Sequence, residues 1–127
     1  MPADPPRVAG LHHVQITIPL GAEAAARAFY VGVLGLTEIS KPASLAGRGG
    51  LWLAVGAIEL HIGTEDGIVR HATKAHVAFA VTDLPAWRLR LEKAGCMIAA
   101  SIPIPCFDRL ESRDPFGNRL EFIERVR

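Results

Sequence analysis

Two histidines and two glutamates recur at matched spacing along this chain. His13 and His76 each lie near the start of a segment that alternates apolar and polar residues, and Glu59 and Glu121 lie in later apolar segments. Glu59 follows His13 by 46 residues, and Glu121 follows His76 by 45. Clusters of imidazoles and carboxylates are candidate metal or acid–base sites. The spacing therefore predicts that these four side chains converge in one cavity.

The alternation of apolar and polar residues, with its breaks at glycine and proline, predicts the strands and helices that must position these residues. An alternating pattern with breaks at glycine and proline indicates strands, and an Ala-rich or i, i+4 apolar pattern indicates helices. Asp83 is a predicted helix N-cap, followed by Pro85 just inside the helix. The predicted strands are 11–18, 36–40, 51–55, 57–62, 75–81, 96–100, 107–112 and 119–124, and the predicted helices are 22–34 and 84–94. Segment 41–50 is expected to be a flexible loop and segment 63–73 a linker.

The two halves of the chain follow one plan. Each reads strand, helix, strand, strand, strand, in modules at about 10–63 and 74–125. A unit of roughly 60 residues buries too little surface to be stable alone, so the modules should pair in a single domain, 1–127. In both first strands the face that carries the histidine is polar or small, and the other face is apolar. The histidine faces should line a concave surface.

Composition excludes several classes of protein. The 127 residues are 50% hydrophobic and carry a formal net charge of +1, so no basic excess favours nucleic acid. No apolar run reaches the roughly 20 residues of a membrane-spanning helix, and the N-terminus does not read as a signal peptide. Cys96 and Cys106 form no CxxC pair. We expect reduced thiols and a cytoplasmic protein.

Several longer sequence motifs resemble those of a known superfamily. They are Leu11-His12-His13-Val14, Phe29-Tyr30 with Val33-Leu34-Gly35-Leu36, Ala75-His76-Val77-Ala78-Phe79, and the run DPFGNRLEF at 114–122. Over about residues 10 to 124 the chain is similar to the vicinal oxygen chelate superfamily, which includes glyoxalase I, bleomycin- and fosfomycin-resistance proteins and extradiol dioxygenases. The resemblance implies an α+β fold in which two paired βαβββ modules form a cup-shaped mixed sheet around one divalent metal ion.

The resemblance also implies which residues bind that ion. Metal ligands in the superfamily come from the first and fourth strands of the modules, which places them at His13, Glu59, His76 and Glu121. Two imidazoles and two carboxylates suit Zn, Ni, Mn, Fe or Co and leave two positions of an octahedral ion for substrate oxygens. The metal would act as a Lewis acid, with Glu121 or Glu59 as the general base. His61 shares a strand face with Glu59, and either could ligate.

Strand alternation and position along the chain predict where the remaining polar side chains point. His12 should point away from His13, and His71 should be solvated. Arg109 and Arg113 share one face of a strand. If that face lines the cup, the arginines could bind an anionic group of the substrate. The alternative is a solvated edge strand.

Three functions are compatible with these residues. The first is a metal-dependent lyase or isomerase of the glyoxalase type, and the second is a dioxygenase or thiol transferase that uses His13, His76 and Glu121. The third is a metal-free protein that sequesters a small molecule, as bleomycin-resistance proteins do. In each case the partner is a small-molecule substrate or ligand, and the resemblance implies a homodimer. The cup could form within one chain or across two.

Overall fold

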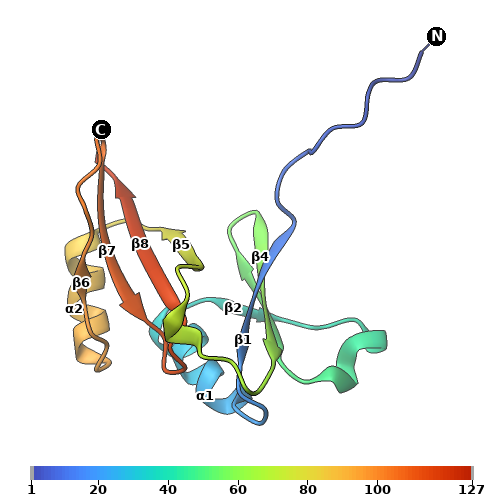
Figure 1. Cartoon of the computed structure of the whole chain (residues 1–127), viewed down its shortest axis with the longest axis horizontal. Coiled ribbons are helices and arrows are strands. Elements are labelled where there is room, and N and C mark those ends of the chain that lie inside the picture. The colour runs from blue at the N-terminus through green and yellow to red at the C-terminus, as the bar shows by residue number, and fades with distance from the viewer. Residues whose placement is uncertain (1, 127) are drawn as a thin grey trace.

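A computed structural model describes residues 2–126, which form two four-stranded sheets, one from each half of the chain (Figure 1). The strand order is β1-β4-β3-β2 in the first sheet and β5-β8-β7-β6 in the second. In each sheet the first strand runs parallel to the last, and the other pairs are antiparallel. This shared topology confirms the α+β fold of two βαβββ modules.

The elements follow the predicted order. In the first module they are β1 (His13–Ile18), α1 (Glu23–Arg27), η1 (Ala28–Val33), β2 (Thr37–Ile39), η2 (Ala43–Arg48), β3 (Leu51–Val55) and β4 (Ile58–Thr64). A short 3₁₀ turn, η3 (Arg70–Ala72), joins the modules. In the second module they are β5 (His76–Ala80), α2 (Leu84–Lys93), β6 (Ala99–Ala100), β7 (Phe107–Arg113) and β8 (Arg119–Arg125). The predicted N-cap is also confirmed, since the Asp83 side chain accepts the Ala86 N–H at 3.2 Å.

Three segments differ from the prediction. Of the strand predicted at 96–100, only Ala99–Ala100 forms a strand. The helix predicted at 22–34 continues after α1 as a π-helix, in which the Leu34 N–H donates to the Phe29 carbonyl at 2.9 Å. The wider turn accompanies the burial of two adjacent aromatic side chains, Phe29 and Tyr30. The segment 41–50 is not an open loop, because η2 occupies most of it.

A buried polar contact fixes one module against the other. The Tyr30 hydroxyl of η1 donates to Asp114 Oδ2 at 2.6 Å, and both residues are buried. Burial and the neighbouring Asp114 charge raise the pKa of Tyr30 well above 10. The Asn118 amide reaches the Thr17 carbonyl at 2.9 Å, and the Arg70 guanidinium reaches the same carbonyl at 2.9 Å. The DPFGN turn therefore anchors the second module to the helix and first strand of the first.

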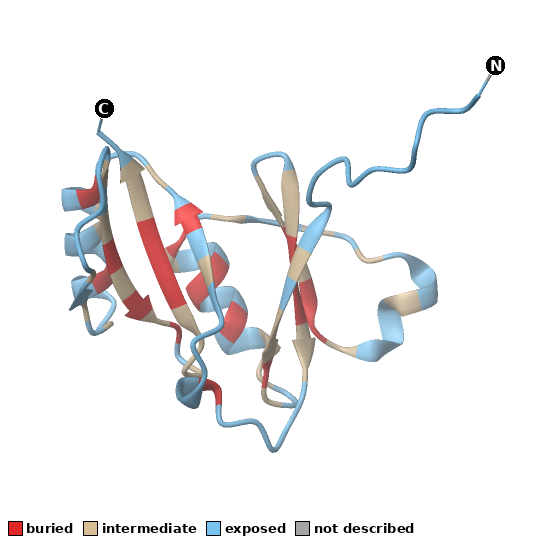
Figure 2. Ribbon diagram, turned by 45° about the horizontal axis from the view of Figure 1, so that its top comes forward, coloured by how far each residue is buried: buried red, intermediate tan, exposed pale blue. Residues whose placement is uncertain are grey.

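The faces of β1 and β5 alternate between buried and open. Val14, Ile16 and Ile18 pack in or against the apolar core, whereas His13 and Gln15 are exposed. In β5, Phe79 is buried while His76 and Ala78 are exposed. Figure 2 shows buried residues on the strands and on the helix between the two sheets, with exposed positions along the first strands. The histidine faces are therefore accessible, as predicted.

Candidate metal centre

The sheet of the first module aligns its polar side chains in rows across three strands. His13 of β1 lies opposite Glu59 of β4, which lies opposite Ala54 of β3. In the next row on the same face, Gln15 lies opposite His61, which lies opposite Trp52. Residues paired in this way project from the same side of a sheet. This face therefore carries His13, Glu59 and His61 together.

Three flat rings stack across this face. The Trp52 and His61 ring centroids are 3.8 Å apart with the planes 3° from parallel, and those of His61 and His13 are 4.0 Å apart at 15°. His61 Nε2 lies 2.8 Å from Glu59 Oε1. This hydrogen bond lowers the pKa of Glu59, so the carboxylate accepts and His61 donates. Glu59 and His61 are thus joined to each other, and Trp52 forms the far wall of the site.

His12 does not point away from His13, contrary to the prediction from strand alternation. Their Nδ1 atoms are 2.9 Å apart, and both side chains line the same cavity. The reason is that β1 begins at His13, so His12 precedes the regular pleat. His71 is exposed, as predicted.

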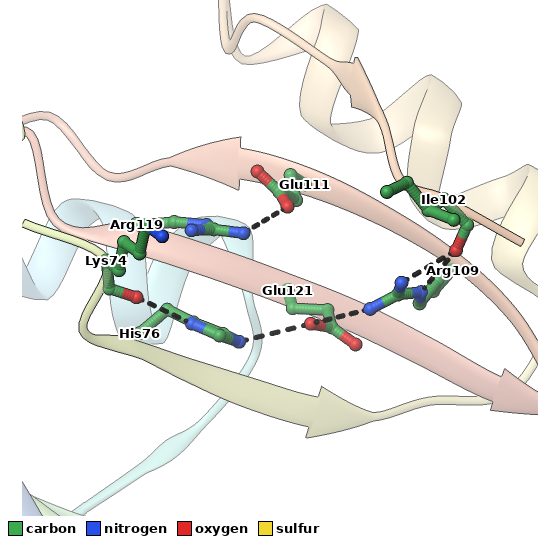
Figure 3. Close-up of polar contacts among 7 residues, drawn as sticks. All are labelled: Lys74, His76, Ile102, Arg109, Glu111, Arg119 and Glu121. Carbon is green, nitrogen blue, oxygen red and sulfur yellow. Dashed lines mark hydrogen bonds and ion pairs between the residues drawn. The ribbon is translucent and has the colours of Figure 1, made fainter. Parts of the chain in front are cut away.

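In the second module, His76 and Glu121 meet across β5 and β8 (Figure 3). His76 Nε2 lies 3.2 Å from Glu121 Oε1, and His76 Nδ1 lies 2.9 Å from the Lys74 carbonyl. A carbonyl only accepts, so Nδ1 donates to it. Nε2 then either donates to the carboxylate as part of an imidazolium or offers a lone pair that can bind a metal ion beside Glu121. A carbonyl on the second ring nitrogen is also the usual arrangement around metal-binding histidines.

Arginines surround this pair on the same sheet face. Arg109 Nη1 lies 3.5 Å from Glu121 Oε1, and its other nitrogens donate to the Ile102 carbonyl at 3.1 and 2.6 Å. Arg119 pairs with Glu111 beside them (Figure 3). Arg113 donates to the Gly117 carbonyl at 3.0 Å and so stabilises the turn. The alternative of a solvated edge strand is wrong, because β7 lies between β8 and β6.

The two modules differ by two residues in where the glutamate lies on the fourth strand. His13 pairs directly with Glu59, whereas His76 pairs with Arg119 and Glu121 pairs with Ala78. Two residues after each histidine, the partners on the fourth strand are His61 and Glu121. By strand pairing, His61 rather than Glu59 is the counterpart of Glu121.

One chain holds the predicted ligands as two separate groups. Within residues 2–126, no three His, Cys, Asp or Glu side chains come close enough to hold a metal ion together. His13, Glu59 and His61 lie on the first sheet, and His76 and Glu121 on the second. The donor types suit a divalent ion, but each sheet of a single chain supplies only part of a site.

A cavity of about 530 Å³ opens beside the first group, and we call it the His13 cavity. Its walls include His13, Gln15, Trp52 and His61 on the sheet. They also include Lys41, which precedes η2, and Arg48, the last residue of η2; neither was predicted from the sequence. Another cavity of about 560 Å³, between α2 and β7, has Arg109 on its wall but none of the five histidines. The His13 cavity is therefore the better candidate for a substrate site.

Comparison with known proteins identifies the family. Residues 10–122 match the model of the Glyoxalase/Bleomycin resistance protein/Dioxygenase superfamily. A solved structure of a glyoxalase family protein from Bacillus anthracis is 39% identical, with a TM-score of 0.88, over 96% of this chain and 99% of that one. The chain therefore belongs to this superfamily, as the motifs predicted.

More distant structures share the fold. Lactoylglutathione lyase from Agrobacterium tumefaciens is 22% identical, with a TM-score of 0.69 over 95% of this chain and 96% of that one. The fosfomycin resistance protein FosX from Listeria monocytogenes is 16% identical, with a TM-score of 0.73 over 91% of each chain. Among curated proteins there is no match. Of the helices in residues 2–126, none has the length and apolarity needed to cross a membrane.

Proposed function

We propose that this protein is a divalent-metal-dependent enzyme of the lyase or isomerase type, acting on a small substrate that chelates the ion through two oxygens. His13, His76 and Glu121 are the proposed ligands, with His61 or Glu59 adjacent. The observation that carries the proposal is the approach of His76 Nε2 to Glu121 Oε1 at 3.2 Å, with His76 Nδ1 held by the Lys74 carbonyl. When bound, the ion would supply Lewis-acid stabilisation of negative charge on substrate oxygens.

Glu121 is the proposed general base. Only 5% of the residue is exposed, and its Oε1 faces both His76 and Arg109. A carboxylate held in this way could accept a proton from a carbon next to a carbonyl. Arg109 would hold the carboxylate in place, since its other donors are fixed on the Ile102 carbonyl. This role replaces the direct substrate contact expected for Arg109, and the turn contact of Arg113 gives that residue a structural role.

We propose further that two chains complete each other's sites in a homodimer. One chain separates His13 from His76 and Glu121, and both histidine faces are open. A second copy would bring the first-module face of one chain against the second-module face of the other. The cysteines Cys96 and Cys106 are free thiols, which supports a location in the reducing cytoplasm.

Metal analysis of protein made without a polyhistidine tag tests the proposal. We expect one divalent ion per chain in the wild type and sub-stoichiometric metal in His76→Ala. Equal metal content in both proteins would contradict it. Conversion of a hemithioacetal of methylglyoxal, with and without the ion, then tests the lyase reaction.

A second function is favoured by the ring stack. Trp52, His61 and His13 present a flat surface beside a cavity of about 530 Å³. A metal-free protein could hold a planar small molecule there. Binding of such a ligand to chelator-treated protein, without turnover under any metal, would favour this alternative.

A further inference from the structure

The His13 cavity is electrostatically one-sided. Lys41 and Arg48 contribute two permanent positive charges to its walls, and the sheet contributes imidazoles. No aspartate or glutamate of residues 2–126 lines it. Two carboxylates lie next to the lining residues. Glu59 accepts from His61, and Glu23, whose negative charge acts on Lys41, accepts from the Gly50 N–H at 3.1 Å. On the cavity wall itself, the permanently charged side chains are both cations.

Its polar groups are mainly hydrogen-bond donors. Lys41 Nζ donates to the Gly49 carbonyl at 2.5 Å, which leaves two of its three protons available. Within residues 2–126 the Arg48 guanidinium has no hydrogen bond or ion pair, so its five donors are available. The Gln15 amide and the Thr64 hydroxyl lie on the same wall. Such donors complement an oxyanion, which only accepts.

The segment that carries Arg48 is anchored to the sheet. Gly49 adopts φ 72° and ψ −178°, which favours glycine. Gly50 packs so closely on β4 that a Cβ atom there would lie 2.0 Å from the Ile62 carbonyl oxygen. The Lys41–Gly49 hydrogen bond closes the segment at its other end. Lys41 therefore precedes a fixed turn, and Arg48 ends it, so neither lies on a free loop.

We propose that the His13 cavity binds an oxyanion group, a carboxylate or a phosphoryl group, through Arg48 and Lys41. The substrate is then a small anionic molecule whose charged group is held beside His13. Calling the ligand a substrate rests on the proposed function, whereas the anion site itself does not. The second module has no comparable excess, because Arg109 faces Glu121 and Arg119 pairs with Glu111.

The test uses the full chain after removal of metal by a chelator, with phenylphosphonate as the probe. Trp52 lines the cavity, so its fluorescence in a Trp87→Phe background reports binding there. We expect Arg48→Ala to weaken binding at least roughly tenfold, since hydrogen bonds between charged groups are strong. Arg48→Lys should restore part of the affinity. The control is Arg88→Ala, an exposed arginine on α2 outside the cavity, which should bind as the wild type does.

The uncharged dimethyl ester of the probe provides a comparison that needs no variant. We expect it to bind much more weakly than phenylphosphonate, and we expect added salt to weaken the phosphonate selectively. Equal binding of ester and acid, or equal loss in Arg48→Ala and Arg88→Ala, would overturn the anion site. Because the protein is metal-free, these results do not depend on the ion. The metal content of the His76→Ala variant tests the proposed enzyme function separately.

Discussion

The two modules share one topology but present opposite chemistry on their open faces. On the first sheet, stacked rings lie beside two cations that have no carboxylate partner on the cavity wall. On the second sheet, Arg109 and Arg119 face Glu121 and Glu111, and the charges offset one another. The fold repeats, whereas the side chains that could bind or react do not.

This difference predicts separate roles for the two modules in binding and in chemistry. The first module has the open cavity and the free donors, which suits recognition of a substrate. The second module has the buried carboxylate and an imidazole that faces it, which suits chemistry. The position of the glutamate contributes, because the first module has it two residues earlier and places His61 where the second module has Glu121.

The largest effect is expected at Glu121. If the second module carries the ion, Glu121→Gln should weaken Zn²⁺ or Ni²⁺ binding by roughly a hundredfold or more, since even indirect partners of metal ligands change affinity about 10–100-fold. The matched control is Glu111→Gln, which lies directly opposite on the same face but pairs with Arg119. Isothermal titration with the metal measures both. Equal losses in the two variants would remove the distinction between these carboxylates.

The next effect concerns the contact that fixes the modules together. Tyr30→Phe removes a donor from the buried Asp114, and leaving a buried acceptor short of a partner costs about 1–3 kcal/mol. Urea unfolding should show this loss in the free energy of unfolding. A double-mutant cycle with Asp114→Asn isolates the pair. An unchanged midpoint in Tyr30→Phe would mean that this hydrogen bond contributes nothing to holding the modules together.

A smaller effect should separate His61 from Glu59. Strand pairing makes His61 the counterpart of Glu121, so we expect His61→Gln to weaken metal binding more than Glu59→Gln, by about tenfold. Loss of the ring stack should also alter the fluorescence of Trp52 in His61→Gln only. The reverse order of metal affinities would restore Glu59 as the ligand that the sequence predicted.

The smallest effect is a difference in how the helices begin. The α1 helix has no side-chain cap, whereas Glu124 of β8 accepts the N–H groups of Asp83 and Leu84 at the start of α2. These hydrogen bonds lower the pKa of Glu124 below its ordinary value of 4.5. A lowered pKa means that the contribution to stability is present above pH 4.5 and is lost as the pH falls through the folded pKa.

Thermal unfolding of Glu124→Gln against the wild type measures this contribution. We expect a small deficit in Tm that is constant near neutral pH and disappears in acid. Glu92→Gln, an exposed position on α2, should show no such deficit. A Glu124→Gln deficit that persists unchanged to low pH would argue against the carboxylate as the cause.

The local sequence pattern was sufficient to predict the strands, the second helix and the two histidine faces. Alternation and helix capping depend only on residues a few positions apart. It failed where distant segments decide the outcome. His12 joined His13 because the strand begins at His13 and not at Leu11, and the predicted loop forms η2 beside Gly50, which packs on the Ile62 carbonyl.

The candidate site was predictable in composition but not in assembly. Motifs identified His13, His76 and Glu121, yet spacing along the chain could not show that strand pairing makes His61, and not Glu59, the counterpart of Glu121. Nor could it show that Arg109 faces Glu121 or that Arg48 is fixed beside a cavity. These relations depend on strand pairing and turn geometry, which a single sequence specifies only through the complete fold.

The central claim is that His13 of one chain joins His76 and Glu121 of another. Heterodimers of His13→Ala and Glu121→Ala chains, isolated with two different tags free of histidine, test it through their metal content. We predict one ion per heterodimer, since one of the two sites then has all its ligands, and almost none in either homodimer. Metal-free heterodimers, alongside wild-type protein that binds metal, would contradict the claim and place the site within one chain.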